Sequence, residues 1–245
     1  AYVGMPSRYP HWSYGKAYEK NKTLYSFNLT GLPYEMVINS DPCLGYLMRE
    51  NTLLLQILTM AHVYGHNDFF KNNRLFREGT KAYYTIEMFK LDADIIRDYI
   101  NDPNIGYTKV EKILDAADAL RFQIPRVVGV KELTQEQIKK ALIDEYNSKL
   151  ENRGPFDETE ESTLPNLNKI PLEPCDDVMG FIIKYSSLED WEKNILKIVK
   201  RESEYFLPQI ETKIMNEGWA SYWHYTLLNE LKLESGLQFE FIKRH

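Results

Sequence analysis

Cysteine is scarce in this chain of 245 residues, with only Cys43 and Cys175 present. The two lie far apart and form no CxxC pattern, which fits a reducing, cytoplasmic compartment. No apolar run reaches the ~20 residues needed to cross a bilayer, and the first residues lack the charged start and hydrophobic centre of a signal peptide. We therefore expect a cytoplasmic protein without a membrane span.

Basic stretches and the common catalytic signatures are missing as well. The net charge of -6 and the absence of Lys/Arg runs argue against a nucleic-acid or anionic-membrane partner. Glycine-rich phosphate loops and a G-x-S-x-G elbow are absent, which leaves a serine triad poorly supported. No Glu-x-x-His pair occurs, so a carboxylate-bridged di-iron bundle lacks its usual ligands.

The chain does contain ample material for a core, being 43% hydrophobic and 13% aromatic. Its patterns predict one mainly helical domain over residues 1–245 with a small β-hairpin. The hairpin is expected from strands at 23–29 and 34–39, followed by a helix that begins with Asp41 as N-cap and Pro42 at the first helical position. Helices are predicted over residues 42–71, 78–101, 108–122, 134–150, 178–204 and 207–233, with Pro208 marking a break.

One segment departs from this helical pattern. Residues 152–177 combine prolines, glycine and many acidic residues without a helix cap. Such a composition is typical of a long surface loop or a partly disordered segment.

The strongest chemical signal is the pair His62 and His66 in a chain with only five histidines. Four residues advance an α-helix by ~400°, so both imidazoles project from one side, about 6 Å apart along the axis. Zinc-binding helices use this separation. Because the preceding run 58–61 is strongly apolar, burying two imidazoles there is costly unless a partner satisfies their nitrogens.

A second cluster downstream offers the carboxylate that a His-His-carboxylate site still needs. Glu217 and His224 are seven residues apart, nearly aligned on one helix face but ~10 Å apart in rise. One ion cannot easily take both, so Glu217 is the candidate third ligand and His224 a candidate oxyanion donor or proton shuttle. Gly218 inside this helix suggests a close approach of another backbone or helix. Asp68 could orient a ligand imidazole or bind a water.

Plainer interpretations exist for each of these residues. A buried histidine is usually a hydrogen-bonded core residue, and an Asp near a helix end, such as Asp68, is more often a cap or a salt-bridge partner. The aromatic residues around Glu217, Tyr222 among them, are mostly expected in the core. His11, in an aromatic loop, is equally a pocket residue or a hydrogen-bonded surface histidine.

At these residues the chain closely resembles the stage V sporulation protein R (SpoVR) family. The matching segments are 4–8, 11–16, 34–40, 61–66, 68–73 and 216–224, which span essentially the whole sequence. The resemblance implies longer relatives, with portions before and after this stretch. It also implies a bacterial, cytoplasmic protein linked in spore-formers to building the peptidoglycan cortex of the spore.

The segment 217–220 is also similar to the Glu-bearing helix of gluzincin-like metallopeptidases. That likeness implies His62, His66 and Glu217 as the metal ligands, on distantly gluzincin-like helices. The sequence departs from the pattern at Val63, where the gluzincin general base would stand. A base from elsewhere, such as Asp68 or His224, would then be required.

Three hypotheses follow from these residues. The first is a metal-dependent hydrolase of the peptidase or amidase type, with zinc as the ion and His224, Asp68 and Tyr222 lining an open ligand position. Its substrate would be a cell-wall peptide or a protein of cortex assembly. The second is a non-catalytic scaffold that the ion stabilises and that acts through protein partners. The third is a metal-free core. Mixed imidazole and carboxylate ligands suit zinc, while iron or manganese fits nearly as well.

Overall fold

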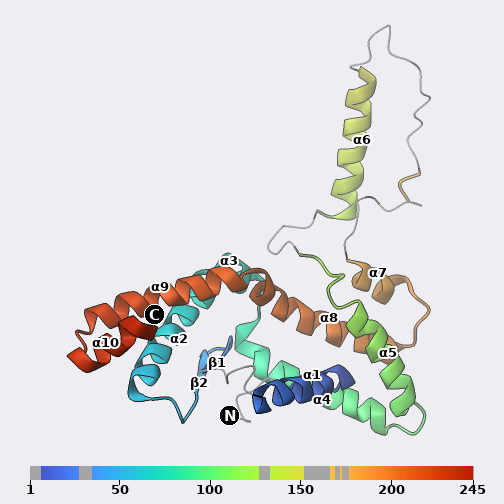
Figure 1. The fold of residues 1–245 in the computed structure, drawn as a ribbon. Coiled ribbons are helices and arrows are strands. Elements are labelled where there is room, and N and C mark those ends of the chain that lie inside the picture. Colours follow the sequence, from blue (N-terminus) through green and yellow to red (C-terminus); the bar gives the residue numbers. More distant parts are fainter. Residues whose placement is uncertain are drawn as a thin grey trace.

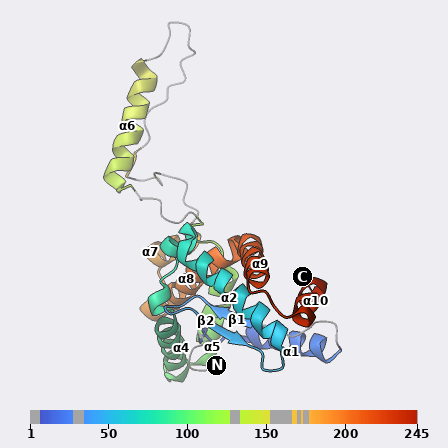
Figure 2. The same ribbon diagram turned by 90° about the vertical axis from the view of Figure 1, so that its left-hand side faces the viewer.

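The computed structural model describes residues 7–27, 35–126, 133–151, 166–168, 172 and 177–244 (Figure 1). Its elements confirm a mainly helical fold with one small antiparallel hairpin. The expectation for the acidic stretch 152–177 falls almost wholly outside the described residues, as does Cys175. Helix α6 (Gln135–Glu151) projects away from the other helices in both views (Figure 2).

The hairpin consists of β1 (Glu35–Ile38) and β2 (Leu44–Leu47), with Glu35 opposite Leu47 and Ile38 opposite Leu44. The prediction of a hairpin is therefore confirmed, and the expected strand at 34–39 contains β1, but its expected partner at 23–29 was wrong. The expected first strand overlaps the end of α1 (Trp12–Ser26), a helix that begins where the sequence indicates loop and a short helix. The expected turn at 30–33 lies outside the described residues.

The predicted helix start at Asp41 was also wrong, because these residues form the connection between β1 and β2. An Asp-Pro pair serves a turn as readily as a helix N-terminus. The helix α2 (Leu53–Asn72) begins eleven residues later, where the Thr52 side chain accepts a hydrogen bond from the Leu55 N–H at 3.4 Å.

The remaining helices include the predicted ones, with shifted ends, and two that were not predicted, at residues 74–79 and 235–244. They are α3 (Arg74–Gly79), η1 (Ala82–Tyr84), α4 (Thr85–Asn101), α5 (Tyr107–Ala119), α7 (Val178–Tyr185), α8 (Asp190–Glu211), α9 (Lys213–Glu230) and α10 (Ser235–Arg244). The predicted helix break at Pro208 was wrong, because this buried proline lies inside α8. The break between α8 and α9 is at Thr212 instead. One lost backbone hydrogen bond near the helix end is offset by burial of the ring.

Two groups of buried apolar side chains hold these helices together. The larger joins α4, α5, α7 and α8 and includes Ile96, Val110, Met179, Ile195 and Val199, all fully buried. The smaller joins α2, α9 and α10 through Leu54, Ala61, Leu228 and Phe241. The second group anchors the two helices that carry the histidines and Glu217. Among the described residues, no helix is both long and apolar enough to cross a membrane.

Helices α2 and α9 run antiparallel in close contact, since His62 meets His224 while His66 meets Asn216. The crossing point is Gly65, where an added Cβ would lie 2.6 Å from the Ala220 Cα. The expectation of such a contact at Gly218 was wrong, because an added Cβ there meets nothing within 4 Å. The small residue that permits close helix packing is therefore the one between the two histidines.

Candidate metal centre

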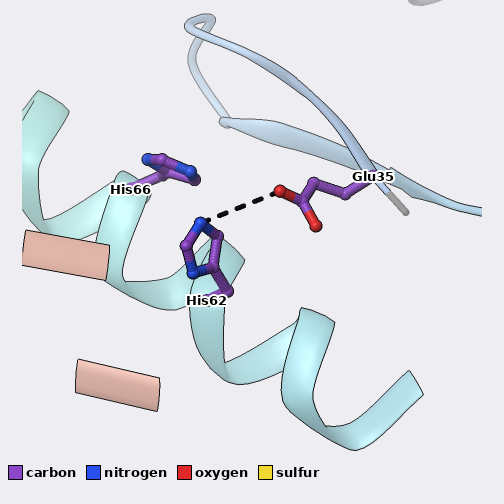
Figure 3. A group of neighbouring side chains, drawn as sticks. All are labelled: Glu35, His62 and His66. Carbon is purple, nitrogen blue, oxygen red and sulfur yellow. Dashed lines mark ion pairs between the residues drawn. The ribbon is translucent and has the colours of Figure 1, made fainter. Parts of the chain in front are cut away.

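Glu35, His62 and His66 form a cluster that could hold a metal ion (Figure 3). One ligand atom from each lies within 4.8 Å of the others. The four-residue spacing on α2 brings the two imidazole rings to a centroid separation of 4.6 Å. Strand β1 adds the carboxylate, whose Oε1 is 3.8 Å from the Nε2 of His62. The side chains are 22%, 11% and 7% exposed for Glu35, His62 and His66, so the cluster is largely shielded from water.

Glu217 of α9 approaches the same two nitrogens. Its Oε2 lies 3.4 Å from the Nε2 of His62 and 3.8 Å from the Nε2 of His66. Its side chain is 54% exposed, which leaves this side of the cluster open to solvent. The two distant segments therefore meet in the fold, while the role of Glu217 as a ligand stays a prediction.

These separations match the size of a bound ion. Nitrogen and oxygen atoms held tetrahedrally at ~2.0–2.1 Å from zinc lie ~3.3 Å apart. The nitrogen to oxygen distances of 3.4 and 3.8 Å around His62 need only a small closure to reach that value. The donor set, two imidazoles with carboxylates, is the one that zinc, iron and manganese accept.

The second nitrogen of each imidazole is already engaged. His66 Nδ1 lies 2.9 Å from Asn216 Oδ1, and an amide oxygen can only accept, so His66 carries its proton on Nδ1 and turns the Nε2 lone pair to the cluster. His62 Nδ1 lies 2.9 Å from His224 Nδ1. If His62 donates there, its Nε2 lone pair also faces the cluster. Such outer partners fix the orientation of metal-binding histidines.

Burial shifts the ionisation of the cluster. Desolvation raises the pKa of Glu35, against the attraction of His66, and nearby Glu217 raises it further. Desolvation and then His66 lower the pKa of His62, while Glu217 opposes this. The lowered pKa favours the neutral form of His62, which is the form that binds metals, and a cation would favour the ionised form of the neighbouring carboxylates.

Strand β1 is positioned by the residue that follows it. Asn39 is buried, its backbone carbonyl accepts from the Tyr205 hydroxyl at 3.0 Å, and its amide donates to Thr80 Oγ1 at 3.1 Å. On the other side, Val63 of α2 packs against Gly45 of β2. These contacts from α2, α8 and Thr80, the residue after α3, hold the hairpin that carries Glu35 beside the histidines.

The other candidate residues have different partners. The Asp68 carboxylate accepts from Trp219 Nε1 at 2.9 Å and from Asn72 Nδ2 at 2.8 Å. Tyr222 is 57% exposed, and its ring stacks on that of Trp219 with centroids 5.9 Å apart. The structure therefore ties both Asp68 and Tyr222 to Trp219, and it brings His224 to the site as the partner of His62.

His11 takes the plainer of its two interpretations. Its Nδ1 accepts from the Ser13 N–H at the start of α1, and its Nε2 lies 2.9 Å from Asp115 Oδ1. This histidine therefore caps a helix and links it to α5.

Sequence reasoning missed Glu35 as a member of the cluster. The signal was one acidic residue within the otherwise apolar or aromatic run 34–38. A carboxylate placed among strand residues is costly to bury without a partner, which was reason to look for one.

The fold and the cluster together define a mainly helical protein with a candidate His-His-carboxylate metal centre. The family model described as SpoVR like protein matches residues 1–245, so the chain belongs to the SpoVR family and the predicted resemblance is confirmed. The chain is also 40% identical over 260 residues to the uncharacterized protein YcgB of Escherichia coli (strain K12). That match covers 99% of this chain and 50% of YcgB, so the chain spans about half the length of this curated relative. No solved structure gives a significant match.

Proposed function

We propose that this chain binds a divalent cation, zinc by its donor set, through His62, His66 and Glu217. Support comes from the Glu217 Oε2, which lies within 3.8 Å of both Nε2 atoms, and from the outer partners that aim those atoms at one point. Asn216 and Glu217 are neighbours on α9, so a single helix supplies a ligand and the orientation of another ligand.

We further propose that the centre hydrolyses an amide bond, with Glu35 as the general base. A zinc ion with one open position lowers the pKa of a bound water towards ~7 and polarises a carbonyl. Val63 cannot take a proton from that water, whereas the Glu35 carboxylate reaches the cluster from β1. The observation that carries this assignment is the position of Glu35, 3.8 Å from a proposed ligand nitrogen and on a different element from Glu217.

The family and the donor chemistry support a proposal for the substrate class. Membership of the SpoVR family supports a part in spore cortex formation, in the cytoplasm, with a peptide or a peptidoglycan-related amide as substrate. The solvent-exposed side of the cluster, at Glu217, would let such a substrate reach the ion. A nucleic-acid partner is not proposed, given the net charge of -6.

A metal-stabilised scaffold is the second candidate, and the number of donors favours it. Glu35, His62, His66 and Glu217 could together fill a tetrahedral coordination sphere, as closed structural zinc sites do. In that arrangement Glu35 is a ligand, the ion ties β1, α2 and α9 together, and the protein acts through partners in cortex assembly.

One pair of variants separates the two functions. Glu217→Gln and Glu35→Gln are compared for bound zinc and for cleavage of peptidoglycan stem peptides, followed by mass spectrometry, with the exposed Glu230→Gln as control. The hydrolase predicts that Glu217→Gln loses zinc, whereas Glu35→Gln keeps zinc and loses cleavage. The scaffold predicts equal loss of zinc in both variants and no cleavage by the unaltered chain.

A further inference from the structure

A cationic pocket lies apart from the metal cluster, where α3, α4 and α8 meet. Its cavity measures about 190 Å³, and its walls include Lys81, Lys197, Lys200, Arg201, Glu204 and Tyr205. Four of these six side chains are positive, in a chain whose net charge is -6. A concave surface that gathers one sign of charge concentrates ligands of the opposite sign.

Two of the positively charged side chains, Arg201 and Lys200, are oriented by ion pairs with acidic residues. Arg201 makes a two-pronged contact with Asp92, a fully buried carboxylate, through Nε at 3.0 Å and through Nη2. Lys200 pairs with Asp177. The guanidinium has five N–H donors, and Asp92 accepts from only two of its nitrogens. Asp92 therefore orients Arg201 and leaves further N–H groups able to donate to a ligand. Its side chain remains 42% exposed.

The net charge of the pocket also depends on its other charged residues. Lys81 and Lys197 are exposed, and among the described residues Glu204 is the one carboxylate that lines the pocket. Glu204 lies 4.0 Å from Lys200, and its side chain is 47% exposed, so it can turn away to solvent. Burial raises the pKa of Glu204 and Asp177 raises it further, while Lys200, Lys81 and Arg201 lower it.

We propose that this pocket binds a phosphate group, either free or carried by a small phosphate ester. Arg and Lys are the side chains that recognise phosphate, Arg through its planar fork and Lys as a point charge. A cavity of about 190 Å³ is smaller than the ~300 Å³ at which pockets for drug-sized ligands begin, so it takes one anionic group rather than a whole nucleotide. This proposal does not depend on the metal centre.

Calorimetry tests this proposal by measuring the binding of inorganic phosphate and of glycerol 3-phosphate to the intact chain. The ionic strength is kept constant by replacing chloride with the added phosphate compound. The double variant Lys81→Gln, Lys197→Gln should weaken binding ~10-fold or more, since each removes a charge-assisted contact. Lys90→Gln, on the exposed surface of α4, should change nothing. Glu204→Gln should tighten binding, because it removes the opposing charge, and this variant keeps the proposal testable if the double variant folds poorly.

Two results would overturn the proposal. One is an unaltered chain that shows no phosphate binding beyond that of chloride. The other is an equal affinity in the chain, the double variant and Glu204→Gln, which would mean that binding occurs elsewhere. A preference for glycerol 3-phosphate over free phosphate would identify the ester as the ligand, and the reverse preference would identify the free ion.

Discussion

Gly65 of α2 and Ala220 of α9 touch so closely that a side chain at residue 65 would place its Cβ 3.2 Å from the Ala220 Cβ. Glu217 lies about one helical turn before Ala220 and His224 about one turn after it. On α2, His62 lies about one turn before Gly65 and His66 directly follows it. The contact between the two small residues therefore sets the distance across which the carboxylate and the imidazoles face one another.

Gly65→Ala should lower the free energy of unfolding by ~1–3 kcal/mol, because the added methyl group overlaps the backbone of α9. Gly218→Ala is the matched control on the partner helix. It should raise stability by ~0.5–1 kcal/mol, since it improves helix propensity where the structure leaves open space. Urea unfolding of both variants measures the two effects. Equal stability of Gly65→Ala and the unaltered chain would contradict the close crossing.

Asn216→Ala should weaken zinc binding ~10–100-fold, as loss of an outer partner of a metal-binding histidine does. The cause is the missing acceptor for His66 Nδ1, which lets the ring rotate and change its protonated nitrogen. Asn229→Ala is the control on the same helix, since its amide donates to the Tyr225 carbonyl at 2.8 Å and accepts from Gln238 Nε2 at 3.4 Å. Competition with a zinc indicator gives both affinities, and an unchanged affinity for Asn216→Ala would count against the site.

Asp68→Ala should leave zinc binding unchanged, because the carboxylate accepts from Trp219 and Asn72 rather than from an imidazole. Loss of these exposed hydrogen bonds should cost less than ~1.5 kcal/mol and should shift the fluorescence of Trp219. Zinc content, urea unfolding and emission spectra provide the check. Loss of bound zinc in this variant would show that Asp68 contributes to metal binding.

Glu202 predicts a pH dependence of stability. It is fully buried, accepts from Arg8 Nε at 3.1 Å and from the Tyr9 N–H at 3.2 Å, and burial raises its pKa from 4.5 to about 7 despite the attraction of Arg8. The folded chain holds this proton more tightly than the unfolded chain. The contribution to stability is therefore complete below pH 4.5 and is lost as the pH rises towards 7.

In the unaltered chain, the free energy of unfolding should decrease between pH 4.5 and 7. Glu202→Gln should make this decrease smaller by up to ~3 kcal/mol. The exposed Glu230→Gln should keep the original slope. Urea unfolding at several pH values gives both slopes. A slope that is the same in the chain and in Glu202→Gln would show that the proton is not taken up at this residue.

Local patterns predicted the helical class, the presence of a hairpin and most helix ends near the observed ones, because amphipathic periodicity and caps act within a few residues. They failed where one signal serves two structures. Asp41-Pro42 fits a turn as well as a helix start, and Pro208 is tolerated inside α8 because the surrounding residues are buried. Tertiary packing decides such cases.

The candidate site shows the same division. The spacing of His62 and His66 predicts a shared face, and α2 places both rings there. The meeting with Glu217 depends on the crossing of α2 and α9, which no local pattern encodes. Glu35 was missed because a single carboxylate in a short strand has no periodic signature, and its neighbours in space come from a different element.

The metal content of the chain purified without chelator tests the account most directly, by elemental analysis of the chain, of His62→Ala and of His11→Asn. His11→Asn serves as control because it removes a histidine outside the cluster and keeps a side chain able to cap α1. We predict about one bound ion per chain in the unaltered protein and in His11→Asn, and almost none in His62→Ala. A chain without bound metal that also fails to take up added zinc, or equal metal in His62→Ala, would contradict the central claim.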